Sequence, residues 1–268
     1  MADAILVDGE WQAHLPADDR GLAYGDGVFR TLRVEAGQPV AWGVHLQRLA
    51  HDCGRLFLPV PDKKQLADDV DRLFSGGRSG VVKIMITRGS GGRGYTPPLE
   101  GSRRIVSAHP LPEDSDRQSP LILTCSPVIL GQQARLAGVK HLNRLEQVLA
   151  REECRRASTE DAVMCDHEDR VICTTMRNLL FVSAEGEWLT PALTRAGIIG
   201  ATRQRLTSAL SAAGVAVHET DIARSQLQTF RGAVACNSVV GVRSVSQIDG
   251  CIFAESESAC EYARKLLI

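Results

Sequence analysis

This sequence of 268 residues has no long apolar run and no excess of basic or acidic residues. No stretch has enough consecutive apolar residues to span a bilayer, and the N-terminus lacks the basic-then-apolar pattern of a secretory signal. The 31 basic and 32 acidic residues leave a net charge of −1, and no run of Lys and Arg marks a nucleic-acid or anionic-membrane surface. We therefore expect a cytoplasmic protein that binds neither nucleic acid nor membranes.

Paired cysteines and clustered histidines are missing as well. The eight cysteines form no C-x-x-C pair and stand mostly inside apolar stretches, as reduced buried thiols do. The seven histidines are scattered and H-E-x-x-H is absent, so spacing indicates no zinc ligands. We expect neither a disulfide framework nor a metal site.

The hydrophobic pattern that is present predicts an α+β protein with two domains. The first half reads as antiparallel strands, two amphipathic helices with apolar faces (Leu46, Leu49, Cys53 and Leu56; then Leu66, Val70 and Leu73 behind an Asp62 cap), and strands at 80–87 and 103–108. The second half alternates strands with helices, including one after Gly200 and one near 256–267. Because "LPEDSDRQSP" is rich in Pro, Asp and Ser, we expect an N-terminal domain over 1–112, a linker over 113–120 and a C-terminal domain over 121–268.

The stretch "RGSGGRGYTPP" at 88–98 contains a literal G-x-G-x-x-G. A dinucleotide site needs a helix to begin at the last glycine, because free N–H groups at a helix N-terminus hold the pyrophosphate. Here two prolines follow, and they favour an extended chain. The stretch instead predicts a glycine-rich loop whose arginines and tyrosine could grip a carboxylate; a surface hairpin with solvated charges fits the same letters.

The segment "AGVKHLNRLEQVLAR" has Lys140 three residues before a predicted helix that starts at about Asn143. Asn143 and Glu146 have the spacing of a capping pair, and apolar residues recur at helical intervals: Leu142, Leu145, Val148 and Leu149. Burial there would favour a neutral, nucleophilic amine. By itself a lysine in a loop is more often a solvated charge, by roughly ten to one.

Four segments together resemble the 4-amino-4-deoxychorismate lyases, a branch of the fold-type IV pyridoxal-phosphate enzymes that also include branched-chain and D-amino-acid transaminases. They are "DRGLAYGDGVFRTLRV", "HLQRL", "RGSGGRGY" and "AGVKHLNRLEQVLAR". The resemblance implies a two-domain D-amino-acid-aminotransferase-like fold, pyridoxal 5'-phosphate as cofactor, a small-molecule substrate, and a homodimer whose active sites are completed at the subunit interface. It implies the conversion of 4-amino-4-deoxychorismate to 4-aminobenzoate and pyruvate, a step of folate biosynthesis. A D- or branched-chain amino-acid transaminase, or a cofactor-binding relative without catalysis, stays open as an alternative.

The resemblance also assigns site residues by position. Lys140 matches the lysine that carries the cofactor and moves the substrate proton, and Arg48 matches an arginine that binds its phosphate. Further phosphate contacts are implied at the helix start and at a turn after an apolar strand: Ala201, Thr202, Asn237 and Ser238. Substrate contacts are implied at four positions: Arg93, Tyr95, Phe29 and His45. For Phe29 and His45, a core aromatic and a structural histidine are equally good readings.

One departure from the resembled pattern is Cys173 in "RVICTTMRN", where related enzymes carry a glutamate that keeps the cofactor's pyridine nitrogen protonated. A buried thiol cannot do this as well, because burial raises its pKa and leaves it neutral. Transamination depends on the electron sink, whereas a lyase whose product becomes aromatic has another driving force. The other interpretation is that Glu168 or Asp169, both in a charged turn, takes this role.

Overall fold

The computed structural model describes residues 4–11, 14–98, 101–113 and 119–267. By its internal contacts the chain divides into two compact units, Met1–Ser115 with Val139–Asn143, and Asp116–Gly138 with Arg144–Ile268. We call them unit 1 and unit 2. In the expected linker over 113–120, residues 114–118 lie outside the described residues, and the expected domain limits stay a prediction.

Unit 1 is built on a six-stranded sheet in the order β2-β1-β6-β5-β3-β4. Every neighbouring pair in it is antiparallel. Its strands are β1 (Ala4–Val7), β2 (Glu10–Trp11), β3 (Gly27–Glu35), β4 (Gln38–Pro39), β5 (Gly80–Thr87) and β6 (Arg103–His109). A turn at Asp8-Gly9 joins β1 to β2. Both residues have positive φ, a conformation that glycine adopts freely and aspartate tolerates.

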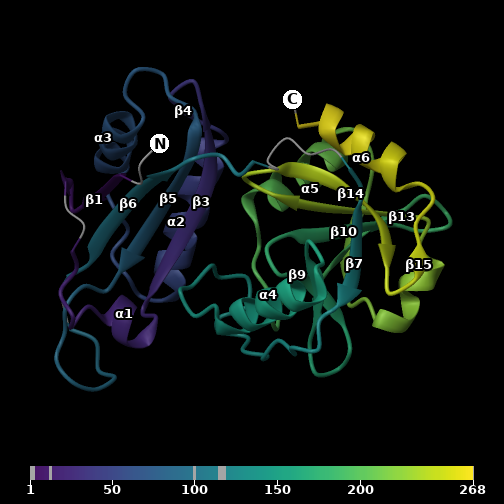
Figure 1. The fold of residues 1–268 in the computed structure, drawn as a ribbon, viewed down its shortest axis with the longest axis horizontal. Helices are drawn as coiled ribbons and strands as arrows, with labels where there is room; N and C mark the ends of the chain where they lie inside the picture. Colours follow the sequence, from purple (N-terminus) through teal and green to yellow (C-terminus); the bar gives the residue numbers. More distant parts are fainter. Residues whose placement is uncertain (1–3, 12–13, 99–100, 114–118, 268) are drawn as a thin grey trace. The chain divides into compact units, whose positions relative to one another are not determined.

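Three helices belong to unit 1: α1 (Arg20–Tyr24), α2 (Trp42–Arg55) and α3 (Lys63–Leu73). Helix α2 packs against β3, and α3 packs against β1 and β6 (Figure 1). The predicted apolar faces are confirmed, since Leu49, Cys53, Leu66 and Val70 lie in the core between helices and sheet. The Asp62 cap is confirmed too, because its carboxylate accepts a hydrogen bond from Gln65 N at 2.9 Å.

Unit 2 contains a nine-stranded sheet in the order β12-β11-β10-β13-β14-β7-β8-β9, with β15 paired to β14. It mixes parallel and antiparallel pairs. Its strands are β7 (Leu121–Cys125), β8 (Ala162–Cys165), β9 (Val171–Thr174), β10 (Asn178–Val182), β11 (Trp188–Pro191), β12 (Val217–Thr220), β13 (Gly232–Asn237), β14 (Gly241–Ile248) and β15 (Cys251–Ile252). Strand β10 is buried along its whole length, which explains its apolar residues at 179–182 after the polar Asn178.

The helices of unit 2 are α4 (Leu145–Ala157), α5 (Ala201–Ala212), the 3₁₀ helix η1 (Arg224–Thr229) and α6 (Ser256–Lys265). Helix α6 packs against β13 and β14, α5 against β12 and β13, and α4 against β8 (Figure 1). Among the described residues, none of the helices has both the length and the apolar character needed to cross a bilayer.

The start of α4 corrects the sequence prediction. The helix begins at Leu145 rather than about Asn143, and its N-cap residue Arg144 makes no capping side-chain bond. Instead, the Asn143 amide donates to Gly25 O at 3.3 Å, and the Glu146 carboxylate accepts from Gly131 N at 2.7 Å. The prediction of a capping pair is therefore wrong, because each of the two side chains bonds to a residue distant in the sequence.

The predicted apolar stripe on α4 exists but does not face a core. Leu145 is 77% exposed, and Val148 and Leu149 are also exposed. Periodicity detected the helix correctly, yet it could not say whether the stripe is covered within the chain.

Candidate active site

Lys140 lies in a short extended segment that adds to the end of β3. Phe29 N donates to Lys140 O at 2.9 Å, Leu142 N donates to Gly27 O at 3.0 Å, and His141 forms an antiparallel bridge with Val28. A Cβ at Gly27 of β3 would lie 2.5 Å from Ile86 O of β5, so only glycine allows β3 and β5 to approach this closely here. The segment holds the half-buried Lys140 by its main chain.

The side chain of Lys140 lies over an aromatic ring. Its Nζ atom is 4.2 Å from the ring centroid of Phe29, and Lys83 Nζ is 5.4 Å from the same centroid. A cation so placed is attracted by the ring's quadrupole. The structure therefore brings together Lys140 and Phe29, two of the residues singled out in the sequence.

Arg48 and His45 both lie on α2 and are buried. Arg48 Nη2 is 3.4 Å from Oδ1 of Asp52, one turn further along the helix. Asp52 is fully buried and also pairs with Arg30 of β3. A guanidinium held in this way keeps its charge in a desolvated place, as anion binding requires.

In unit 2, the N-terminus of α5 has its first amides free of side-chain capping. Its N-cap residue is Gly200, which has no side chain to cap these amides, and Ala201 and Thr202 are buried just inside the helix. Thr202 Oγ1 lies 3.0 Å from Ser238 Oγ. Free N–H groups, the positive end of the helix dipole and two hydroxyls form a donor set that suits a phosphate ester.

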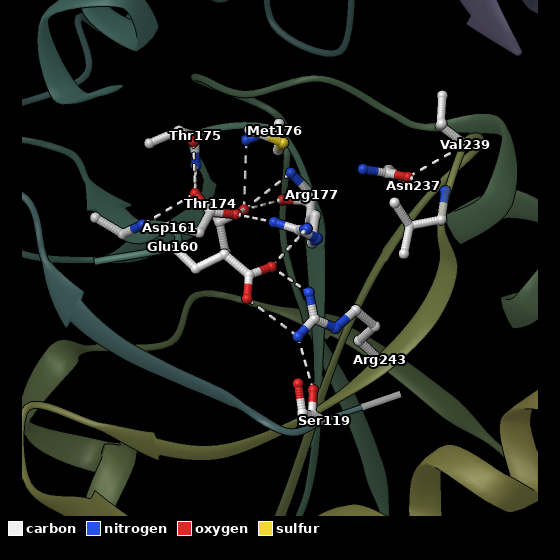
Figure 2. Close-up of polar contacts among 12 residues, drawn as sticks. Ser119, Glu160, Asp161, Thr174, Thr175, Met176, Arg177, Asn237, Val239 and Arg243 are labelled. Carbon is white, nitrogen blue, oxygen red and sulfur yellow. Dashed lines mark hydrogen bonds and ion pairs between the residues drawn. The ribbon is translucent and has the colours of Figure 1, made fainter. Parts of the chain in front are cut away.

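Asn237 makes hydrogen bonds within its own turn. Its Oδ1 accepts from Val239 N at 3.0 Å and Val240 N at 2.9 Å, and Figure 2 shows Asn237 beside Val239. This oxygen therefore shapes the turn that contains Ser238. Whether its amide nitrogen also contacts an anion stays a prediction.

Asn178, at the start of β10, was missed by sequence reasoning. Its Nδ2 donates to Ile198 O at 2.8 Å and its Oδ1 accepts from Gly200 N at 3.0 Å. It thereby fixes the turn that leads into α5. The available signal was an amide residue opening an otherwise apolar strand, which needs a polar partner when buried.

Asp161 is a second residue that sequence reasoning missed. It is fully buried and accepts from Thr174 Oγ1 at 2.7 Å and Thr175 N at 3.1 Å, and it pairs with Arg177. Figure 2 shows these groups converging on its carboxylate, beside the pair that Glu160 forms with Arg243. Asp161 therefore fixes the bend between β9 and β10, and with it the position of Asn178 and of Cys173.

Cys173 lies on β9 and is buried. Burial raises the pKa of its thiol to about 12, and nearby Asp161 adds to this while Arg144 opposes it. The group is a neutral thiol at physiological pH. Glu168 and Asp169 are exposed in the turn between β8 and β9, where Glu168 pairs with Arg170 at 2.9 Å.

The glycine-rich loop begins no helix anywhere between residues 88 and 98, which confirms the prediction that no helix follows the last glycine. Arg93 and Tyr95 are both exposed, Tyr95 to 86%, and their substrate contacts stay a prediction. The loop is held by Arg20, whose Nη1 donates to Gly94 O at 2.9 Å and whose Nη2 donates to Tyr95 O at 3.1 Å.

Comparison with known proteins shows which family this chain belongs to. The profile of the family described as amino-transferase class IV matches residues 27–248. This chain belongs to that family. The class IV assignment also confirms the fold-type IV resemblance and the α+β fold drawn from the sequence.

Two class IV relatives have names that bear on chemistry. An aminodeoxychorismate lyase of Vibrio harveyi is 36% identical over 245 residues, which is 90% of each chain. The crystal structure of 4-amino-4-deoxychorismate lyase from Pseudomonas aeruginosa matches with a TM-score of 0.88 and 39% identity, over 98% of this chain and 96% of that one. The branched-chain amino acid aminotransferase of Escherichia coli shares the fold, with a TM-score of 0.85 over 99% and 93% of the chains at 21% identity.

Proposed function

We propose that this protein is a lyase that converts 4-amino-4-deoxychorismate into 4-aminobenzoate and pyruvate. The observation that carries the proposal is near-full-length similarity, at 36% and 39% identity, to two proteins named as this lyase. The aminotransferase of similar fold is much less similar in sequence, at 21%.

Pyridoxal phosphate is the cofactor that the family implies, and the donor groups of this chain fit it. Lys140 would bind it covalently, and the phosphate would be held by Arg48 and by the N–H and hydroxyl groups at Ala201, Thr202 and Ser238. The carboxylate of Asp52 compensates part of the Arg48 charge, so the arginine can bind an anion without leaving an isolated cation buried. When bound, the cofactor supplies an electron sink for the substrate's amine-bearing carbon.

Lys140 would then act as the proton carrier. Its Nζ takes the proton from the amine-bearing ring carbon of the substrate, and the resulting ammonium is stabilised by the Phe29 ring, 4.2 Å away. The bond between the neighbouring carbon and the enolpyruvate oxygen then breaks and the six-membered ring becomes aromatic. The released enolpyruvate takes up one proton at its methylene carbon to become pyruvate, in place of the proton that Lys140 removed. The atoms of the substrate are divided between the two products, so neither water nor an oxidant is consumed.

Arg93 and Tyr95 would receive a substrate carboxylate, with His45 and Phe29 lining the same cavity. Both loop residues are exposed, and the glycines around them allow the loop to change conformation. A planar guanidinium and a phenol can together bind a carboxylate through several hydrogen bonds.

Cys173 favours the lyase over a transaminase. A thiol with a pKa of about 12 is a weak acceptor and cannot keep a pyridine nitrogen protonated as a carboxylate does. Aromatisation of the product supplies driving force in the lyase reaction that transamination lacks.

The test is an assay with freshly generated substrate that follows 4-aminobenzoate and pyruvate together. We expect equal amounts of both from the native enzyme and none above background from Lys140→Ala. Lys83→Ala is the matched control, because it removes the other cation near the Phe29 ring and should retain activity. Amino transfer dependent on an α-keto acid would identify a transaminase instead, and cofactor binding with no product would identify a non-catalytic relative.

We also propose that the protein is a cytoplasmic homodimer. The exposed apolar side chains of α4 support association, since contiguous apolar surface on a monomer often marks an interface. The cytoplasmic location rests on the sequence expectation alone.

A further inference from the structure

A carboxylate holds the main chain of Lys140 from the side of α2. Lys140 N donates to Oδ2 of Asp52 at 3.0 Å, and Lys140 O accepts from Phe29 N at 2.9 Å. Both main-chain polar groups of the lysine are thus bound within unit 1, one by a helix side chain and one by strand β3. The Cα–Cβ direction of Lys140 is fixed by these two bonds.

The same carboxylate is the buried centre of a cluster of basic side chains. Arg30 Nη2 pairs with Asp52 and also donates to Arg48 O at 3.4 Å, and Arg48 Nη2 lies 3.4 Å from Asp52 Oδ1. His51 Nδ1 is 3.2 Å from the same oxygen. Asp52 is fully buried and Arg30 almost so, and burial lowers the pKa of Arg30 while Asp52 opposes that shift.

We propose that Asp52 is a positioning residue that fixes the main chain of Lys140 and joins it to the buried arginines Arg30 and Arg48. The role rests on the proposed function, in which Lys140 carries the cofactor and Arg48 binds its phosphate. Arg30 and Phe29 are neighbours on β3, so their side chains leave opposite faces of the strand. Arg30 aligns Asp52 on one face, while Phe29 supports the Lys140 ammonium on the other.

Two substitutions separate the hydrogen bond from the charge. Asp52→Asn keeps an oxygen that can accept from Lys140 N but removes the negative charge beside two guanidinium groups. Asp52→Ala removes both. Asp69→Asn is the matched control, because Asp69 is buried in unit 1 and paired with Arg104 at 2.6 Å, and its side chain bonds to neither Arg30 nor Lys140 among the contacts described.

The first measurement is hydrogen exchange at the Lys140 amide in the full-length protein. We expect strong protection in the native protein, a loss of ~10-fold or more in Asp52→Ala, and native protection in Asp52→Asn and Asp69→Asn. Native-like exchange in Asp52→Ala would overturn the proposal. If that variant does not fold, the native protein still tests the idea, because a Lys140 amide that exchanges as fast as the loop amides at 91–93 would contradict it.

The second measurement is the pH dependence of Lys140 acetylation in the cofactor-free full-length protein, read by peptide mass spectrometry. The titratable groups nearest Lys140 are Arg30, Arg48, His51 and Asp52 on the side of its main chain, and Lys83, which shares the Phe29 ring with its amine. Removing the one negative charge among them should lower the pKa of the Lys140 amine in Asp52→Asn, and Asp69→Asn should leave it unchanged. An equal effect of both variants would reduce Asp52 to a structural ion pair.

Neither measurement depends on turnover. If the lyase assay fails while exchange and acetylation behave as expected, the proposed function is wrong and the positioning role of Asp52 stands. If the assay succeeds and the two measurements fail, the proposed function stands and the positioning role of Asp52 is wrong.

Discussion

At the scale of single residues, the buried thiols should make the protein less stable as the pH becomes alkaline. Burial raises the pKa of Cys173 and of Cys236 to about 12, from an ordinary value of 9.0. The folded state therefore binds these protons more tightly than the unfolded chain. The stabilisation is complete below pH 9 and is lost as the pH rises from 9 towards 12.

We predict that Cys173→Ala reduces this loss. Between pH 8 and pH 10.5, the unfolding free energy of the native protein should fall by about 2 kcal/mol more than that of the variant. Urea unfolding at the two pH values measures the difference. Cys251→Ala, at a half-buried position, is the control, and its unfolding free energy should fall by as much as that of the native protein. Identical falls for native protein and Cys173→Ala would mean that this thiol titrates normally.

At the scale of elements, the turn before α5 depends on a glycine for steric reasons. A Cβ at Gly200 would lie 2.3 Å from Asn178 Oδ1, although the φ of −73° suits any residue. Gly200→Ala must therefore displace the side chain that holds both Gly200 N and Ile198 O.

We predict that Gly200→Ala costs about 1–3 kcal/mol of unfolding free energy, measured by urea unfolding. Gly43→Ala, at a helical position where a Cβ meets nothing within 4 Å, should cost nothing. If the clash is the cause, adding Asn178→Ala to Gly200→Ala should cost much less than the sum of the single effects. Simple additivity of the two substitutions would point to another cause.

The elements also show where local patterns succeed. The faces of α2 and α3 followed from periodicity because helical spacing and burial agree there. At α4, Asn143 and Glu146 had the correct spacing for a cap, yet their side chains bond to Gly25 and Gly131. A local pattern states only what two neighbours can do, and a distant partner can offer a better bond.

At the scale of the whole molecule, the exposed apolar face of α4 predicts self-association. We expect light scattering at micromolar concentration to give a mass twice that of the 29.0 kDa chain. Leu149→Glu should shift the protein towards the single-chain mass, because a charge in an apolar interface is desolvated without a partner.

Ile252→Glu is the matched control for that experiment. It places the same charge at another exposed apolar position, away from α4, and should leave the mass unchanged. A native protein with the mass of one chain would contradict the homodimer, and equal effects of the two substitutions would place the interface elsewhere.

The sequence by itself determined the α+β class, most strands and helices, the family, and Lys140 with Arg48 as candidates, since these follow from short-range periodicity and contiguous motifs. Tertiary structure alone revealed the bond from Lys140 N to Asp52, 88 residues away along the chain, and the hold of Asn178 on Gly200. In the sequence Arg30 looks like an ordinary charged strand residue. It is buried because folding brings Asp52 of α2 to that face of β3. Such contacts join residues with no fixed spacing, so only the packing of strand, helix and loop decides them.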